Sequence, residues 1–144
     1  MNKLFAAILL VLVSLATLSA ANDESIESLK ARAAAASGSK QVELFTEIAE
    51  HQLGAVAKAY DEGQTKQAEV ALHDVQEYGL KAAQTSQETG KRMKNTEIAI
   101  RKISDKLEDL SRSIDTDERP PVTKALKQLE AARSELLRYM FRKR

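Results

Sequence analysis

Apolar and small residues recur at alternating steps of three and four along the middle of the chain, and this spacing restricts the fold more than any other feature. The positions are Leu72, Val75, Gly79, Ala82, Ser86, Thr89, Met93, Thr96, Ile100, Ile103, Leu107, Leu110 and Ile114. Side chains at this spacing lie on one face of an α-helix, in the a and d positions of a heptad. Strong helix formers dominate the remaining sequence after residue 21, and β-branched runs with period-two alternation are absent. We therefore predict an all-α protein.

The heptad frame continues across Gly90 without a change of phase, and no proline occurs between Gln64 and Arg119. A loop of free length would usually shift the phase. The sequence is therefore compatible with one continuous helix through Gly90, which would join elongated antiparallel hairpins. Glycine costs about 1 kcal/mol relative to alanine inside a helix, so a turn at Gly90 is the other arrangement. A turn would give a compact four-helix bundle.

Glycine and proline divide the chain into two predicted helical hairpins. Gly63 ends a long apolar stripe, and a short turn leads into the next helix, so the first hairpin spans residues 40–88. Pro120 and Pro121 follow an acidic stretch and can open a helix but cannot continue one. The second hairpin therefore spans residues 93–141. A short helix should precede both hairpins.

The first 21 residues have the pattern of a secretory signal peptide. Lys3 gives a positive start, an almost unbroken apolar run extends from Leu4 to Leu18, and the small residues of Ser19–Ala21 follow. An uncleaved membrane anchor is the alternative, but a spanning helix needs about 20 apolar residues. We expect cleavage near Ala21 and export to the periplasm or the cell exterior. One all-helical domain, residues 22–144, then remains.

Charge is distributed unevenly along this domain. Residues 22–90 contain 6 Lys and Arg against 12 Asp and Glu, whereas residues 91–144 contain 15 against 9. Such asymmetry can steer association with a protein partner, or between copies of the chain from acidic end to basic end. Nucleic acid is not an expected partner.

Two basic clusters are candidates for binding an anionic membrane or polymer surface. They comprise Lys91, Arg92 and Lys94 near Gly90, and Arg142, Lys143 and Arg144 at the end of the last helix. We favour the simpler interpretation that the first cluster is a solvated helix face and the second satisfies the helix terminus.

The chain has few groups that could catalyse a reaction. It has no Cys, no Gly-rich phosphate loop and no Ser in a nucleophile elbow, so we expect neither enzymatic activity nor a cofactor. His51 and His73 have carboxylates at helical spacing: Glu47 precedes His51, and Glu69 and Glu77 flank His73. A Glu/His site for a divalent metal is one interpretation. Surface histidines beside helix-stabilising carboxylates explain the same residues, and we favour that.

The turn of the first hairpin resembles part of a tetratricopeptide repeat. The match lies in AYDEGQTKQAEVALHDV, on Ala59, Gly63, Ala68, Leu72 and Val75, and covers less than one repeat. That family packs helical hairpins into arrays that bind peptides, so the resemblance implies binding of a protein partner. We expect a nonenzymatic exported helical protein that acts as an interaction or scaffold module in the cell envelope. A binder of anionic surfaces is the alternative.

Overall fold

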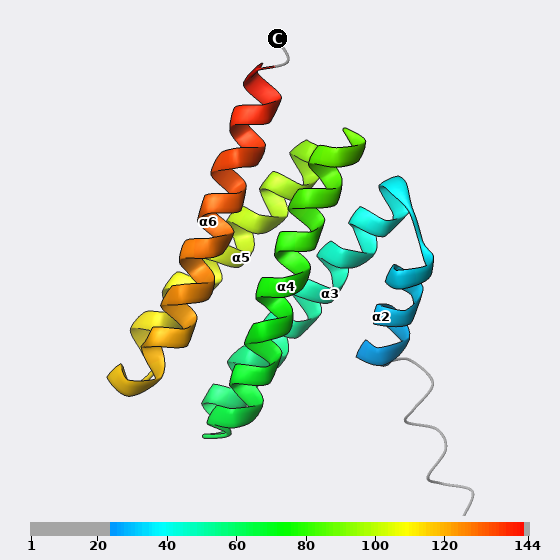
Figure 1. Ribbon diagram of the computed structural model, residues 1–144. Helices are drawn as coiled ribbons and strands as arrows, with labels where there is room; N and C mark the ends of the chain where they lie inside the picture. The colour runs from blue at the N-terminus through cyan, green and yellow to red at the C-terminus, as the bar shows by residue number, and fades with distance from the viewer. Residues whose placement is uncertain (1–23, 143–144) are drawn as a thin grey trace, which may run out of the picture.

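A computed structural model describes residues 24–142 of the chain (Figure 1). Within this range it contains α-helices and no strand, which confirms the all-α prediction. The elements are α2 (Ile26–Ala35), α3 (Gly38–Asp61), α4 (Thr65–Thr89), α5 (Met93–Ser113), the 3-10 turn η1 (Thr116–Glu118) and α6 (Arg119–Arg142). The predicted signal peptide lies outside the described residues. No helix in the described range is both long enough and apolar enough to cross a membrane.

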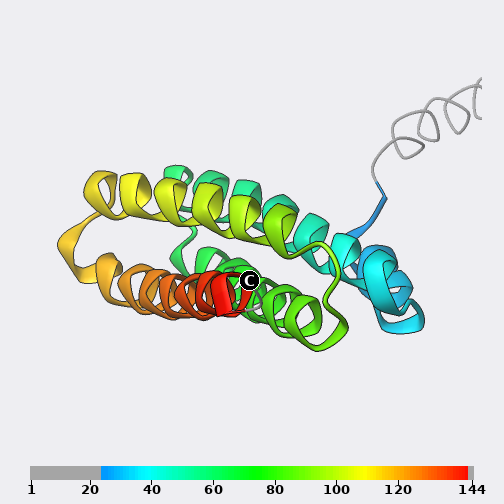
Figure 2. The same ribbon diagram turned by 90° about the horizontal axis from the view of Figure 1, so that it is seen from above.

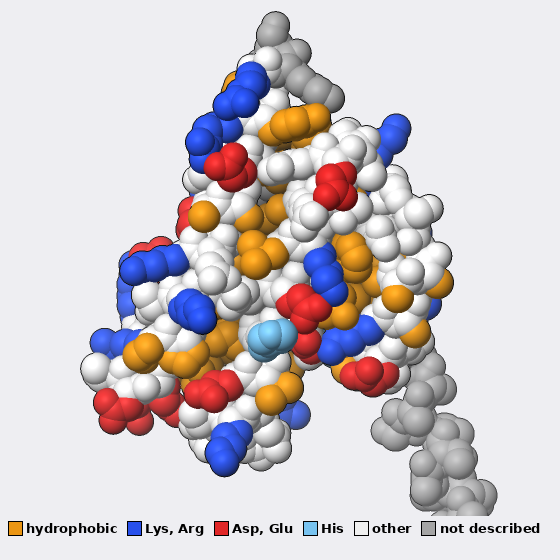
Figure 3. Space-filling model, in the orientation of Figure 1, with side chains coloured by type: hydrophobic (Ala, Val, Ile, Leu, Met, Phe, Trp, Pro, Cys, Tyr) orange, Lys and Arg blue, Asp and Glu red, His pale blue; other side chains and the backbone are white. Residues whose placement is uncertain are grey.

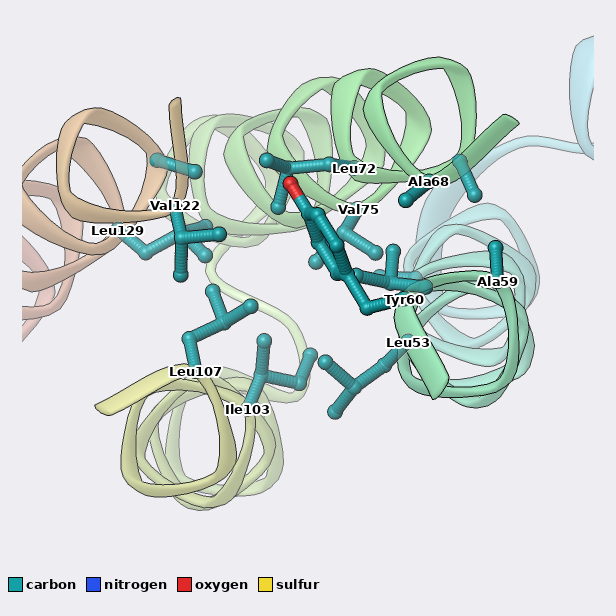
Figure 4. Close-up of a cluster of buried hydrophobic side chains, with 14 of the residues drawn as sticks. Leu53, Ala59, Tyr60, Ala68, Leu72, Val75, Ile103, Leu107, Val122 and Leu129 are labelled. Atoms are coloured by element: carbon teal, nitrogen blue, oxygen red, sulfur yellow. The ribbon is translucent and has the colours of Figure 1, made fainter. Parts of the chain in front are cut away.

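The four long helices form a bundle around one core. Helices α3 and α4 pack as an antiparallel hairpin, α5 and α6 form a second, and α6 also packs along α4 (Figures 1 and 2). One cluster of buried side chains draws on all four helices (Figure 4). Its members include Leu53, Val56, Leu72, Val75, Ile103, Leu107, Val122 and Leu129. The apolar positions at three-and-four spacing thus face a shared interior, as an amphipathic helix requires.

The chain turns at Gly90, so continuity of a helix through this residue is wrong and the bundle with a turn is correct. Gly90 has φ 68°, Arg92 has φ 55°, and α5 begins directly after Arg92. The Ser86 hydroxyl donates to the Lys91 carbonyl oxygen at 2.6 Å and holds the turn. The turn lets the apolar stripe of α5 bury against the other helices, whereas a straight helix would leave both of its apolar ends exposed.

Alanine substitutions at two glycines should have opposite effects on stability. Gly90 has a left-handed backbone conformation, which alanine adopts only with strain. Gly90→Ala is therefore expected to lower the free energy of unfolding by about 1 kcal/mol. Gly54 lies inside α3, and an added Cβ meets nothing within 4 Å, so Gly54→Ala is expected to raise it by about 1 kcal/mol. Urea denaturation of both variants measures this. Stabilisation by Gly90→Ala would contradict the observed turn.

The turn between α3 and α4 contains the residues that resemble a tetratricopeptide repeat. Gly63 has φ 70°, and the backbone N–H of Gln64 donates to the Ala59 carbonyl oxygen at 2.8 Å. Ala59, Ala68, Leu72 and Val75 are buried between the two helices. The likeness therefore corresponds to a tight antiparallel hairpin, here between helices of 24 and 25 residues.

Helix α2 packs on the outside of α3. Ser25 caps its N-terminus by accepting a hydrogen bond from the backbone N–H of Ser28 at 3.2 Å. Leu29 and Ala33 of α2 bury against a small second core that includes Phe45 and Ile48 of α3. The short predicted first helix is therefore present, and it covers a face of the bundle next to α4.

Candidate functional site

The side of the bundle between α3 and α5 is open. These two helices contact each other much less than α3 contacts α4 or α5 contacts α6. The residues that α3 places there are small or charged, among them Thr46, Glu50, Gly54, Ala57 and Asp61. Those of α5 include Asn95, Lys102, Lys106, Asp109 and Ser113. Such side chains do not interdigitate as large apolar ones do, so the helices stay apart.

Three adjoining hollows form a continuous groove along this side, which we call the α3–α5 groove. Their volumes are about 360, 490 and 210 Å³. Glu50 lines both the first and the second hollow, and Ala57 and Leu110 line both the second and the third. On the inner side of the gap, Leu53 of α3 and Ile103 of α5 point toward one another (Figure 4). The groove thus has an apolar floor.

The second and third hollows form the acidic half of the groove. Five carboxylates line them, against one lysine, Lys106. The carboxylates belong to Glu50, Asp61, Asp109, Asp115 and Glu118. Between them lie Gly54 and Ala57, which are exposed, and Leu110, which is half-buried. A basic segment with an apolar side chain is the ligand chemistry that such a surface fits.

The first hollow, at the other end of the groove, has mixed charge. Glu43, Glu47 and Glu50 of α3 face Arg92 and Lys102 across it, and Arg92 Nη1 lies 3.7 Å from Glu43 Oε2. The wall also contains Thr96, whose hydroxyl is buried and has no hydrogen-bond partner among the described residues. Because Arg92 pairs with Glu43, the charges of the first hollow are partly compensated within the chain.

The predicted basic residues gather at one end of the bundle. Lys91, Arg92 and Lys94 are exposed around the α4–α5 turn, and Arg142 is exposed where α6 ends, at the same end of the molecule (Figure 1). Lys143 and Arg144 lie outside the described residues. Of the first cluster, Arg92 turns toward Glu43 of α3. Lys91 and Arg92 precede α5 and only Lys94 lies within it, so this cluster is a solvated turn and not a continuous helix face.

Carboxylates gather in the two turns at the opposite end. Asp61 and Glu62 lie where α3 ends, and Asp115, Asp117 and Glu118 lie in the turn that leads into α6. Acidic side chains gather at the lower left of Figure 3. The Thr65 hydroxyl donates to Glu118 Oε1 at 2.5 Å and ties the two turns together. These carboxylates come from both halves of the sequence, so the charge asymmetry between the halves does not map onto the two ends of the bundle.

The predicted metal ligands are only partly brought together. His73 Nδ1 lies 3.6 Å from Glu77 Oε2, and Asp74 completes a group of three possible ligands within 4.8 Å of one another. His51, Glu47 and Glu69 are exposed and do not belong to this group. Lysine ammonium groups already lie on both carboxylates, Lys30 on Asp74 at 2.8 Å and Lys81 on Glu77 at 2.6 Å. A cation would have to compete with them.

Asp74 is the centre of a buried polar contact among three helices that sequence reasoning missed. Its carboxylate pairs with Lys30 of α2 and accepts a hydrogen bond from Gln52 Nε2 of α3 at 2.7 Å. Lys30 Nζ also lies 5.7 Å from the centre of the Tyr78 ring, and Lys81 Nζ lies 4.8 Å from it. The spacing of the sequence gives no signal for this pairing, since the three residues come from three helices. Its arrangement fixes α2 on the bundle.

Stability is expected to fall at alkaline pH. The hydrogen bond to Asp74 raises the pKa of Lys30, the hydrogen bond to Glu77 raises the pKa of Lys81, and burial raises the pKa of Tyr60. The folded state therefore holds these protons more tightly than the unfolded state. The stability that these three groups contribute is fully present when the pH is below their ordinary pKa values, 10.5 for Lys and 10.0 for Tyr. It is lost as the pH rises through their pKa values in the folded state.

Urea denaturation between about pH 9 and 12 measures this loss. Lys30→Met should reduce the slope of stability against pH, because it removes one of the titrating groups. Lys66→Met removes the same charge from an exposed position on α4 and serves as the control. Equal slopes for Lys30→Met and the unsubstituted protein would contradict the assignment.

The chain matches no protein-family model, no curated protein and no solved structure.

Proposed function

We propose that this protein is a nonenzymatic, exported helical interaction module of the cell envelope, and that the α3–α5 groove is its docking surface for a protein segment. The observation that carries the proposal is the groove itself, a long hollow with an apolar floor and charged walls on one side of a well-packed bundle. Helical segments bind to such grooves through apolar anchors, while flanking charges select the partner.

The chemistry of the groove also supports binding rather than catalysis. Its described walls contain carboxylates, lysines and one arginine, but no histidine or cysteine. Glu43 pairs with Arg92, and Glu118 accepts a hydrogen bond from Thr65, so these two carboxylates are held by the fold. The Ser113 hydroxyl, which lies with Lys106 and Asp109 in the second hollow, donates to the Leu110 carbonyl oxygen at 2.9 Å and not to a base.

Site-specific photocrosslinking in living cells tests the proposal. A photoreactive phenylalanine analogue replaces Ala57, which is exposed in the groove, or Ala131, which is exposed on α6 away from it. We expect an adduct to one protein from position 57 and none from position 131, with the bound segment identified by mass spectrometry of the crosslinked peptide. The same adducts from both positions, or none from position 57, would remove the groove as the docking surface.

Binding to an anionic membrane surface is the second candidate, because the basic residues meet at one end of the bundle. Phe141 there is 65% exposed and precedes Arg142 in the chain. Basic residues with an exposed aromatic ring are typical of membrane-surface contacts. Flotation with phosphatidylglycerol vesicles tests this. We expect Arg142→Glu to abolish flotation if the basic end is the functional surface, and Lys66→Glu to leave it unchanged.

A further inference from the structure

The end of α6 extends beyond the rest of the bundle (Figure 1). Leu136 is fully buried, and every residue from 137 to 142 is half-buried or exposed; we call residues 137–142 the α6 tip. The tip presents Phe141, a residue that is 65% exposed, and the exposed residue Arg142. Arg138 forms an ion pair with Glu135 one turn earlier, so its charge is partly balanced within α6. The tip is therefore a short basic helix end with an aromatic side chain.

The acidic half of the α3–α5 groove has the complementary chemistry. Its five carboxylates outnumber the single lysine, and its hollow of about 490 Å³ is lined by Leu53, Gly54, Ala57 and Leu110. Gly54 leaves room for a side chain, because an added Cβ there meets nothing within 4 Å. Asp109 is partly balanced by Arg112, whose Nη1 lies 3.7 Å away, whereas no ion pair forms on Asp61 among the described residues.

The tip is shorter than the acidic half of the groove and can lie within it. The acidic half runs along α3 from Glu50 to Asp61, about 16 Å at 1.5 Å per residue. The six residues of the tip span about 9 Å. Moreover, the tip and the acidic half lie at opposite ends of the bundle, so one molecule cannot place its own tip in its own groove (Figure 1). A second copy can.

We propose that the α6 tip of one copy docks into the acidic half of the α3–α5 groove of a second copy, with Phe141 in the hollow and Arg142 against the carboxylates. This inference rests on the proposed function, because it names the partner of the same groove. The contact is heterologous, since tip and groove are different surfaces. A pair of bound copies therefore leaves one tip and one groove unoccupied. Copies therefore add head to tail into a ring or a filament. The small area of the tip makes each contact weak and sensitive to salt.

Sedimentation of the full chain at several concentrations tests the proposal. We expect oligomers at about 50 mM salt that dissociate at about 500 mM, as screening requires. Arg142→Glu, which disables the tip, and Asp61→Lys, which disables the groove, should each raise the dissociation constant at least about tenfold. Lys66→Glu and Asp105→Lys make the same changes in net charge at exposed positions outside both surfaces, and they should leave association unchanged.

Mixing the two disabled variants gives the decisive result. The Asp61→Lys chain retains a functional tip and the Arg142→Glu chain a functional groove, so the mixture should form a 1:1 dimer that cannot grow. No dimer in the mixture, or no salt-sensitive oligomer of the unsubstituted chain, overturns the proposal. If the chain does not self-associate but floats with phosphatidylglycerol vesicles, and this flotation requires Arg142, the proposal is overturned and the tip is a membrane-binding surface. A crosslink from position 57 to a different protein overturns this inference but leaves the proposed function intact.

Discussion

Replacement of Leu129 by alanine is expected to lower the free energy of unfolding by about 3 kcal/mol. Leu129 is fully buried in α6 and belongs to the core that the four long helices share. It packs directly on α4 at Gly79, where an added Cβ would lie 2.6 Å from Leu129 Cδ2. Truncation removes buried apolar surface and leaves a cavity at the contact that joins the two hairpins. Urea denaturation measures the loss.

A second substitution at Gly79 tests whether this contact is the cause. In the unsubstituted protein, the methyl group of Gly79→Ala must displace the Leu129 side chain, which offsets the gain in helix propensity of about 1 kcal/mol. In the Leu129→Ala background the methyl group has room, so Gly79→Ala should restore part of the lost stability. Residues in direct contact are expected to couple in this way. Strictly additive effects would show that α4 and α6 do not meet at Gly79.

Replacement of Asp74 by alanine is expected to lower the free energy of unfolding by about 2 kcal/mol. The substitution leaves Gln52, which is 8% exposed, without its hydrogen-bond partner, and leaves Lys30 without its counter-ion. The Lys30 side chain is 26% exposed and can turn toward water, which keeps the cost below that of a fully buried charge. Urea denaturation measures the total, and limited proteolysis within α2 should accelerate because α2 loses its polar anchor.

Two further variants separate the charge from the hydrogen bond. Asp74→Asn retains an oxygen that can accept from Gln52 but loses the charge, so it should cost less than Asp74→Ala. The double variant Lys30→Met with Asp74→Leu replaces the pair by apolar groups and should recover much of the stability. A cost for Asp74→Asn equal to that for Asp74→Ala would assign the whole effect to the ion pair.

The sequence predicted the helices and their buried faces because apolar periodicity is a local property. Ile103 and Leu107 are buried at the predicted heptad spacing. The same periodicity did not predict the turn at Gly90. The residues at the heptad positions between Gly79 and Thr96 are mostly small or polar, so they are compatible with a continuous helix and with a turn. The turn depends on Ile100 and its neighbours burying against helices that are distant in the sequence.

The groove was missed for a related reason. Gly54 and Ala57 are ordinary helical residues in the sequence, and they form a hollow only because α5 lies opposite them. Asp74 gave no signal either, since its partners Lys30 and Gln52 come from other helices. By contrast, the two basic clusters can be read directly from the sequence. Their grouping at one end of the bundle required the antiparallel arrangement of α5 and α6.

The most direct test of the groove as the docking surface is the crosslinking yield from position 57 after the groove has been filled. Gly54→Leu places a large side chain in the hollow, and it should stabilise the fold because leucine is a stronger helix former than glycine. We therefore predict a crosslinking yield at least about tenfold lower, in a protein that unfolds at a higher urea concentration. An undiminished yield from position 57 in Gly54→Leu would contradict the account, because a filled groove could not hold its partner.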